Sequence, residues 1–270
     1  MPTSRRAVID VGTNSVKLLV AEVAGRTVRP LLEKSEQTRL GSGFYETHRL
    51  QPETIAKTAH AVAQFAAEAA RWQPSSVRVI ATSAARDAVN QAELLQAIQQ
   101  ASGLAVEVIS GEQEADWVFA GVTTDPDLSS QPLLIVDVGG GSTEFILGEG
   151  SVQYFRQSFR LGTVRLLEAQ RLSDPPQRSE WEICHARLGE FLDKQIAPAL
   201  APSLGDRAPR SVQLVGTGGT TTILARMHLR SDSFDRDRIE AVLLKREEVW
   251  GAQKHLWSLP LATRSQIPGL

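Results

Sequence analysis

The chain is notable first for what it lacks. It has one cysteine, Cys184, among 270 residues, so no internal disulfide can form, as is usual in a reducing compartment. It has no basic surplus, because its net charge is −2, and this argues against binding nucleic acid or anionic lipid by bulk charge. The N-terminal apolar run is short and contains Asp10, so we expect no signal peptide, no membrane span and a cytoplasmic location.

The sequence also lacks the residue spacing of a zinc site and of a catalytic Cys–His pair. None of the histidines has zinc-ligand spacing to another ligand. Cys184 and His185 are adjacent in a helix-like stretch, where neighbouring side chains diverge by about 100°, so we do not expect a catalytic pair. The five histidines, far apart in the sequence, are His48, His60, His185, His228 and His255.

Strand-like and helix-like segments alternate along the chain, which is typical of an α/β protein. The segment 123–132, rich in Asp, Ser and Pro, is the predicted domain boundary. The predicted strands are 7–12, 16–23, 26–34, 76–83, 104–109, 133–138, 143–148, 151–158, 211–216 and 239–244. The predicted helices are 52–72, 85–103, 111–122, 163–171, 177–195, 220–229 and 247–258.

An internal repeat is the most informative feature of the sequence. Placing Asp10 on Asp137 shifts the chain by 127 residues and aligns "DVGTNS" with "DVGGGS". Apolar Leu18 and Leu19 then fall on Phe145 and Ile146. Two strand–turn–strand units about half a chain apart predict two related domains, each contributing one hairpin to a shared cleft.

Each repeated turn combines an aspartate with glycine and hydroxyl residues. Glycines let backbone N–H groups converge on an anion, and hydroxyls add further donors. A carboxylate beside a phosphate is favourable if Mg²⁺ lies between them. We therefore predict phosphate contacts from Gly12, Thr13, Asn14, Ser15 and Lys17 in the first hairpin, and from Gly139, Gly140, Gly141, Ser142 and Thr143 in the second. Asp10, Asp137 and Glu144 are the predicted metal anchors, direct or through water, for Mg²⁺ or for Mn²⁺ in its place.

Two further segments are candidates for the same site. The turn "VGTGGTTT" follows a strand and opens a helix, and it adds Gly216, Thr217, Gly218 and Gly219 as predicted phosphate contacts. The stretch "ISGEQEADW" opens another helix, with Ser110 and Gln113 as a capping box. Glu112 and Glu114 flank its apolar face on opposite sides, so periodicity leaves open which one activates a water.

Together these residues resemble the exopolyphosphatase/guanosine pentaphosphate phosphohydrolase (Ppx/GppA) family of the actin-like ATPase superfamily. The motifs are "DVGTNSVKLLV", "ATSAARDAVN", "EVISGEQEA", "IVDVGGGSTEF", "LGTVRL" and "VGTGGTTT", in the family's order. The resemblance implies an α/β fold of two ribonuclease-H-like domains with mixed sheets and an inter-domain cleft. We place these domains at residues 1–125 and 131–270.

The resemblance also implies roles for individual residues. It assigns the catalytic base to Glu114, a phosphate contact to Lys17, the metal-associated acids to Asp137 and Glu144, and a cleft-side arginine to Arg86. The implied reaction is the Mg²⁺-dependent release of terminal phosphate from inorganic polyphosphate or from pppGpp. The implied partners include ppGpp. Whether the protein forms a homodimer is left open.

Two departures from the family pattern stand out. Thr13 occupies a position where serine is commoner, which keeps the hydroxyl. In the family, a segment with an Arg-Ala pair and a closing helix and strand follows the "RSQIPGL" stretch, so the second domain is expected to lack its closing elements and a cleft arginine.

Two other functions fit parts of the pattern. A non-catalytic sensor of (p)ppGpp or polyphosphate would bind these ligands tightly without turnover. A small-molecule kinase of the same superfamily would use the "GTGGT" turn for adenosine and would transfer phosphate to a small acceptor.

Overall fold

The first sheet is built by strands β1–β5 in the computed structural model, which describes residues 3–170, 172–205 and 212–270. Its strand order is β3-β2-β1-β4-β5. Strands β1, β2 and β3 are antiparallel, and β4 and β5 run parallel to β1, so the sheet is mixed. The strands span Ser4–Val11, Val16–Ala24, Thr27–Glu36, Ser76–Ala81 and Val106–Val108.

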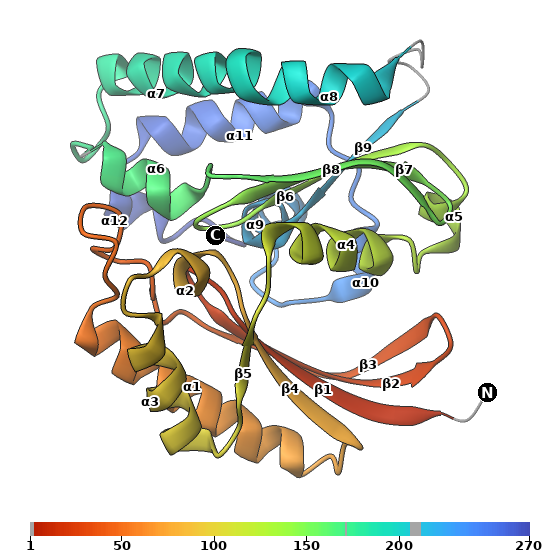
Figure 1. Ribbon diagram of the computed structural model, residues 1–270. Helices are drawn as coiled ribbons and strands as arrows, with labels where there is room; N and C mark the ends of the chain where they lie inside the picture. The colour runs from red at the N-terminus through yellow and green to blue at the C-terminus, as the bar shows by residue number, and fades with distance from the viewer. Residues whose placement is uncertain (1–2, 171, 206–211) are drawn as a thin grey trace. The chain divides into compact units, whose positions relative to one another are not determined.

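Helices α1 (Pro52–Ala70) and α3 (Gln91–Ser102) pack together on one face of this sheet (Figure 1). Pro52 begins α1, a position where its missing N–H costs no hydrogen bond. The apolar stripe of α1 buries Val62 and Phe65 in the same core as Ile9 of β1. This core fixes the end of β1, where the first predicted phosphate turn begins.

The predicted helix 85–103 is two helices, α2 (Ser83–Asp87) and α3. Buried Asn90 separates them, because its side chain binds a distant backbone segment. Its Oδ1 accepts from Leu50 N at 2.8 Å, and its Nδ2 donates to Leu50 O at 3.1 Å. A long-range contact of this kind is invisible to helical periodicity.

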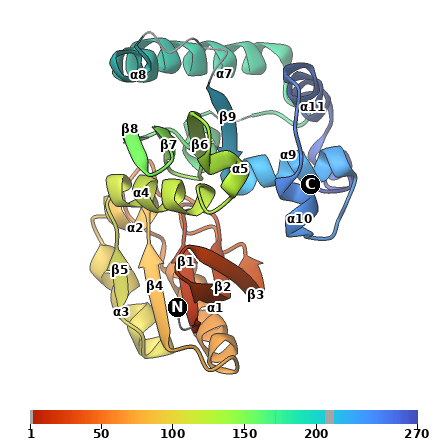
Figure 2. The ribbon, with the colours of Figure 1, turned by 90° about the vertical axis from the view of Figure 1, so that its right-hand side faces the viewer.

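The second sheet repeats the arrangement of the first four strands, with the order β8-β7-β6-β9. Helix α4 (Gly111–Val122) packs against β7 and β8, as Figure 2 also shows. The predicted fold class, α/β with two mixed sheets flanked by helices, is therefore confirmed. The strands of this sheet span Leu133–Val138, Thr143–Glu149, Val152–Phe159 and Gln213–Thr217.

Backbone contacts divide the chain into two compact units. The first comprises Met1–Ala169 and Arg210–Leu214, and the second comprises Gln170–Pro209 and Val215–Leu270. The segment predicted as a boundary contains the short helix α5 (Pro126–Ser129) and lies inside the first unit. These units have other bounds than the predicted domains, 1–125 and 131–270. One reason is that α4, from the first predicted domain, packs on β7 and β8, from the second.

The second unit is mainly helical. The prediction of a strand at 239–244 is wrong. Asp235 instead caps the short helix α10, which includes the start of that segment, by accepting a hydrogen bond from Arg238 N at 3.2 Å. Across the described residues, no helix combines the length and apolar character needed to cross a membrane. The helices of this unit are α7 (Arg178–Phe191), α8 (Ala197–Leu204), α9 (Gly218–Leu229), α10 (Arg236–Glu240), α11 (Arg246–Ser258) and α12 (Leu261–Arg264), with a π-helical turn over Leu192–Ile196.

Candidate active site

The two glycine turns have the same backbone hydrogen bond. Gly12 N donates to Ser15 O at 3.0 Å, and Gly139 N donates to Ser142 O at 3.0 Å. The strands leading into these turns are in the same register, since Asp10 faces Lys17 and Asp137 faces Glu144. The repeat found in the sequence is therefore present in the backbone, and it places one aspartate at the entrance of each turn.

The two turns also lie against each other within the first unit. A Cβ added at Gly140 would lie 3.1 Å from Thr13 Cβ. A Cβ added at Gly141 would lie 2.6 Å from both Ser83 Oγ and Tyr45 Oη, and 2.7 Å from Thr13 Oγ1. The glycines of the second turn are thus required by the side chains that pack around it, and three hydroxyl groups lie close to Gly141.

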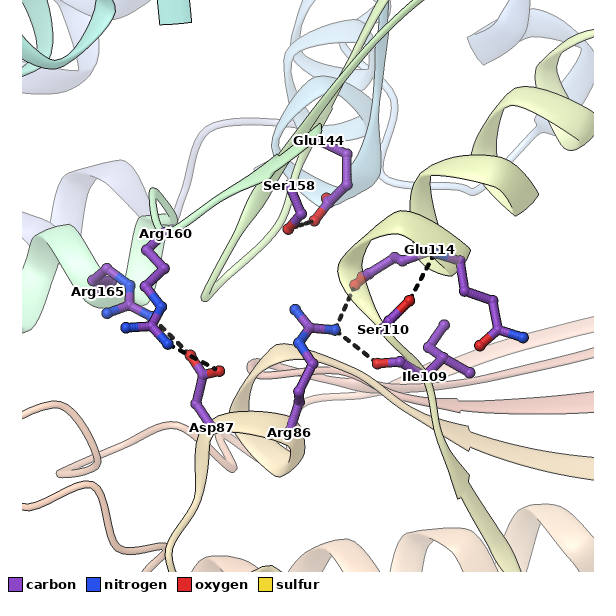
Figure 3. Close-up of polar contacts among 10 residues, drawn as sticks. Arg86, Asp87, Ile109, Ser110, Glu114, Glu144, Ser158, Arg160 and Arg165 are labelled. Atoms are coloured by element: carbon purple, nitrogen blue, oxygen red, sulfur yellow. Dashed lines mark hydrogen bonds and ion pairs between the residues drawn. The ribbon is translucent and has the colours of Figure 1, made fainter. Parts of the chain in front are cut away.

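Glu114 enters this region from the first turn of α4. Ser110 caps that helix by accepting from Gln113 N at 3.1 Å, as its sequence predicts. Arg86 Nη1 donates to Glu114 Oε2 at 3.2 Å and to Ile109 O at 2.9 Å, so the guanidinium fixes the carboxylate against the start of the helix (Figure 3). Glu112 on the same helix is exposed. The structure thus separates two glutamates that the sequence could not distinguish.

Glu144 of β7 is the second buried carboxylate. Only 1% of it is exposed, and its Oε1 accepts from Ser158 Oγ of β8 at 2.6 Å (Figure 3). Burial raises the pKa of Glu114, and the charge of Glu144 raises it further, while Arg86 lowers it. Burial also raises the pKa of Glu144, against the hydrogen bond from Ser158. The two acids therefore interact electrostatically, and a cation between them would relieve their repulsion.

Asp10 belongs to the same group of acids. Burial raises its pKa to about 6; Lys17 opposes this shift and Asp137 adds to it. Although part of the residue is accessible, Asp10 Oδ1 is shielded from solvent and has no hydrogen-bond partner among the residues that the structure describes. A hard cation prefers such oxygens, so these residues fit Mg²⁺ chemically. Within the described residues no three His, Cys, Asp or Glu side chains are grouped to hold a metal by themselves, so phosphate oxygens and water would complete its coordination.

The other predicted contacts fall into three groups. Lys17 is exposed on β2 beside the first turn. Thr143 is already engaged, because its Oγ1 donates to Leu161 O at 2.6 Å. The predicted third turn, 215–222, is the end of β9 followed directly by the start of α9, and Gly218 has a φ of 89° there. The buried Thr217 Oγ1 has no hydrogen-bond partner within the described ranges. This turn lies mostly in the second unit, so its part in the phosphate site stays a prediction.

Several residues of this region carried no signal strong enough to be singled out from the sequence. Ser158 is one serine in an ordinary strand, Ser83 begins a short helix, and Tyr45 follows a glycine turn, Gly41–Gly43, that is not part of the repeat. Arg165 lies in the "LGTVRL" motif, which contributes to the family resemblance without indicating a role. These side chains matter only because the fold brings them to Glu144 and to the second turn.

A duplicated hairpin with glycine turns, next to buried acids and an arginine, is typical of α/β proteins that handle phosphate groups. Comparison with family models agrees with this class. Residues 19–248 match the model of the Ppx/GppA phosphatase family, so the chain belongs to that family. The resemblance inferred from the motifs is confirmed.

Individual relatives support the same assignment. A protein named exopolyphosphatase 2 from Mycobacterium tuberculosis is 38% identical over 236 residues, covering 83% of this chain and 72% of the relative. The crystal structure of an exopolyphosphatase from Cytophaga hutchinsonii superposes with a TM-score of 0.86 at 27% identity, over 98% of this chain and 83% of that one. A Ppx/GppA family member from Aquifex aeolicus gives a TM-score of 0.76 at 29% identity, over 100% and 84% of the two chains.

Proposed function

We propose that the protein is a Mg²⁺-dependent phosphohydrolase that releases the terminal phosphate of inorganic polyphosphate or of pppGpp. The observation that carries this proposal is the position of Glu114, which lies beside Arg86 and interacts with Glu144, while Glu112 faces solvent. The name of the mycobacterial relative favours polyphosphate as a substrate. The motif resemblance favours pppGpp as a second one.

In the proposed reaction Glu114 accepts a proton from a water molecule. The water oxygen forms a bond to the terminal phosphorus as the bridging P–O bond breaks, and the shortened chain leaves with that oxygen. A general base works best when its pKa lies near the working pH, and burial shifts Glu114 in that direction. Arg86 keeps the carboxylate oriented through its bonds to Glu114 and Ile109.

Asp10, Asp137 and Glu144 would hold the metal together with substrate oxygens. Mg²⁺ bound there would neutralise charge on the phosphate oxygens. Lys17 would add a positive charge next to the first turn, and the N–H groups of both turns would bind the phosphate oxygens.

The test is phosphate release from polyphosphate and from pppGpp, with Mg²⁺ and with EDTA. Glu114→Gln should lower kcat about 10²- to 10⁴-fold with little change in KM. Glu112→Gln is the matched control on the same helix turn and should stay within about twofold of the unchanged protein. Circular dichroism should show that both variants fold.

Three results would count against the proposal. Equal activity with Mg²⁺ and with EDTA would show that the reaction needs no metal. An inactive Glu112→Gln variant, together with an active Glu114→Gln variant, would show that Glu112 is the base. Tight binding of both substrates without any turnover would identify a sensor instead.

A further inference from the structure

The second glycine turn is held from one side by the start of helix α6 (Thr163–Ala169). Thr163 N donates to Gly139 O at 3.0 Å, and Val164 N donates to Gly140 O at 2.9 Å. The backbone N–H of Arg165 also reaches Gly140 O, at 3.2 Å. Two of the three glycine carbonyls are therefore bound by backbone groups of one short helix.

The side chain of Arg165 binds the third carbonyl. Its Nε donates to Gly141 O at 3.0 Å. The same guanidinium pairs with Asp87 Oδ2 at 3.4 Å and lies over the Tyr45 ring, with Cζ 4.3 Å from the ring centroid. Figure 3 shows Arg165 and Asp87 facing each other. Because it is held on three sides, this guanidinium can restrain the Gly141 carbonyl.

The direction of these carbonyls determines the direction of the next N–H groups. In a trans peptide the C=O and the following N–H point in opposite directions. With the carbonyls of Gly139, Gly140 and Gly141 turned toward α6, the N–H groups of Gly140, Gly141 and Ser142 point away from it. Within the described residues these three N–H groups have no acceptor. They form the type of backbone arrangement that binds anions.

We propose that Arg165 is a positioning residue that keeps the peptide plane between Gly141 and Ser142 turned so that its N–H binds a phosphate oxygen. A glycine peptide is conformationally free, and the backbone of α6 does not restrain this particular plane. The proposal deepens the proposed function, since it concerns how the same site holds phosphate, but it predicts phosphate binding whether or not hydrolysis follows.

A simpler role for Arg165 would be to add positive charge. Arg160 distinguishes the two roles, because it also pairs with Asp87, at 3.9 Å, but it makes no hydrogen bond to the turn among the described residues. Its side chain is 78% exposed, so its removal should disturb the fold little. Arg160→Ala is therefore the matched control for local charge, and Arg165→Lys keeps the charge while removing the Nε–H donor.

The experiment is calorimetric titration of the whole chain with inorganic triphosphate in Mg²⁺ buffer, together with amide NMR of ¹⁵N-labelled protein. Arg165→Lys and Arg165→Ala should weaken binding about tenfold or more, because a charge-assisted hydrogen bond is lost. Arg160→Ala should stay within about twofold. Triphosphate should shift the Gly140, Gly141 and Ser142 amide signals in the unchanged protein, and these shifts should shrink in Arg165→Lys.

The outcomes separate this proposal from the proposed function. If the protein binds triphosphate but hydrolyses nothing, the enzyme assignment fails and the Arg165 comparison still applies. Unchanged affinity in Arg165→Lys, or equal losses in Arg160→Ala and Arg165→Ala, would overturn the positioning role. A protein that does not bind triphosphate at all would overturn it as well.

Discussion

The β1–β2 and β6–β7 hairpins have the same strand register and the same turn hydrogen bond, but they differ in charge at the position that faces the aspartate. The residue facing the aspartate is Lys17 in the first hairpin and Glu144 in the second. Lys17 is exposed, whereas Glu144 is 1% exposed. The first hairpin therefore places a cation beside its carboxylate, and the second gathers two carboxylates. Under the proposed function, Lys17 of the first hairpin would contact phosphate, and Glu144 of the second would help to hold the metal.

The turns themselves differ in a complementary way. Thr13 and Asn14 of the first turn are equivalent to Gly140 and Gly141 of the second. Thr13 is 4% exposed because it occupies the space that side chains at these glycines would need. The backbones are nevertheless held alike. Arg39 N donates to Asn14 O at 2.9 Å, as Arg165 Nε does to Gly141 O at 3.0 Å.

The largest effect is expected when alanine is placed at the two equivalent positions, 141 and 14. Gly141→Ala puts a Cβ within 2.7 Å of three hydroxyl oxygens, so the turn must shift and its N–H groups lose their alignment. We expect kcat/KM for phosphate release to fall about 10²- to 10³-fold, the usual loss for a preorganised donor. Asn14→Ala removes side-chain atoms without crowding and should cost less than about tenfold. Equal losses in the two folded variants would show that the turns are functionally alike.

Exchanging the chemistry at the facing position should have intermediate effects of two different kinds. Glu144→Gln should raise the Mg²⁺ concentration needed for half-maximal activity about 10- to 100-fold, as for other residues that support a metal. Lys17→Met should instead raise the substrate KM about tenfold, through loss of one charge-assisted contact, with the Mg²⁺ requirement unchanged. Phosphate release measured over a matrix of Mg²⁺ and substrate concentrations separates the two. Identical behaviour of both variants would contradict the division of labour.

The pH dependence of stability tests the carboxylates of the metal-free protein. Burial raises the pKa of Asp10 from 3.8 to about 6, so between these values the folded state holds more protons than the unfolded state. This contribution is fully present below pH 3.8 and is lost as the pH rises through 6, so it lowers stability in EDTA by roughly 3 kcal/mol between pH 4 and 7. Melting temperatures should show a loss over this range that is smaller in Asp10→Asn and partly reversed by Mg²⁺. The same profile in Asp10→Asn would assign the loss to other groups.

The smallest expected effect is energetic coupling between the two turns. Gly140→Ala brings a methyl group 3.1 Å from Thr13 Cβ, and Thr13→Gly should relieve that contact. Urea unfolding of the two single variants and the double variant should give a coupling energy of about 1 kcal/mol. The double variant should be more stable than the sum of the two single effects predicts. Strict additivity would mean that Val164, 3.2 Å from the same position, absorbs the added volume.

Much of the fold could be predicted because it depends on local pattern. The strands around the two turns follow alternating or continuous apolar runs, and Ser110 caps α4 as expected. The prediction of a strand at 239–244 was wrong because a capping aspartate, Asp235, outweighs the β-propensity of the residues that follow. The break between α2 and α3 at Asn90 was not predicted, because the hydrogen-bond partner of Asn90, Leu50, is 40 positions away in the sequence.

The site was predictable only where residue type alone indicates chemistry. Acids and glycines beside a turn indicate phosphate and metal binding, so Asp10, Asp137 and Glu144 could be proposed directly. The choice of Glu114 needed the family resemblance, and the structure adds its contact with Arg86. Arg165 could not be found this way, because its role depends on a carbonyl of the second turn, and sequence patterns do not show the direction of carbonyls.

The packing of Thr13 against the second turn also has an evolutionary consequence. Side-chain volume in this region is shared between the two copies, so neither hairpin can change its turn independently. A bulkier residue at position 140 or 141 would be accepted only in a lineage where position 13 had become smaller. The two repeats, although 127 residues apart in the chain, should therefore covary at these few positions.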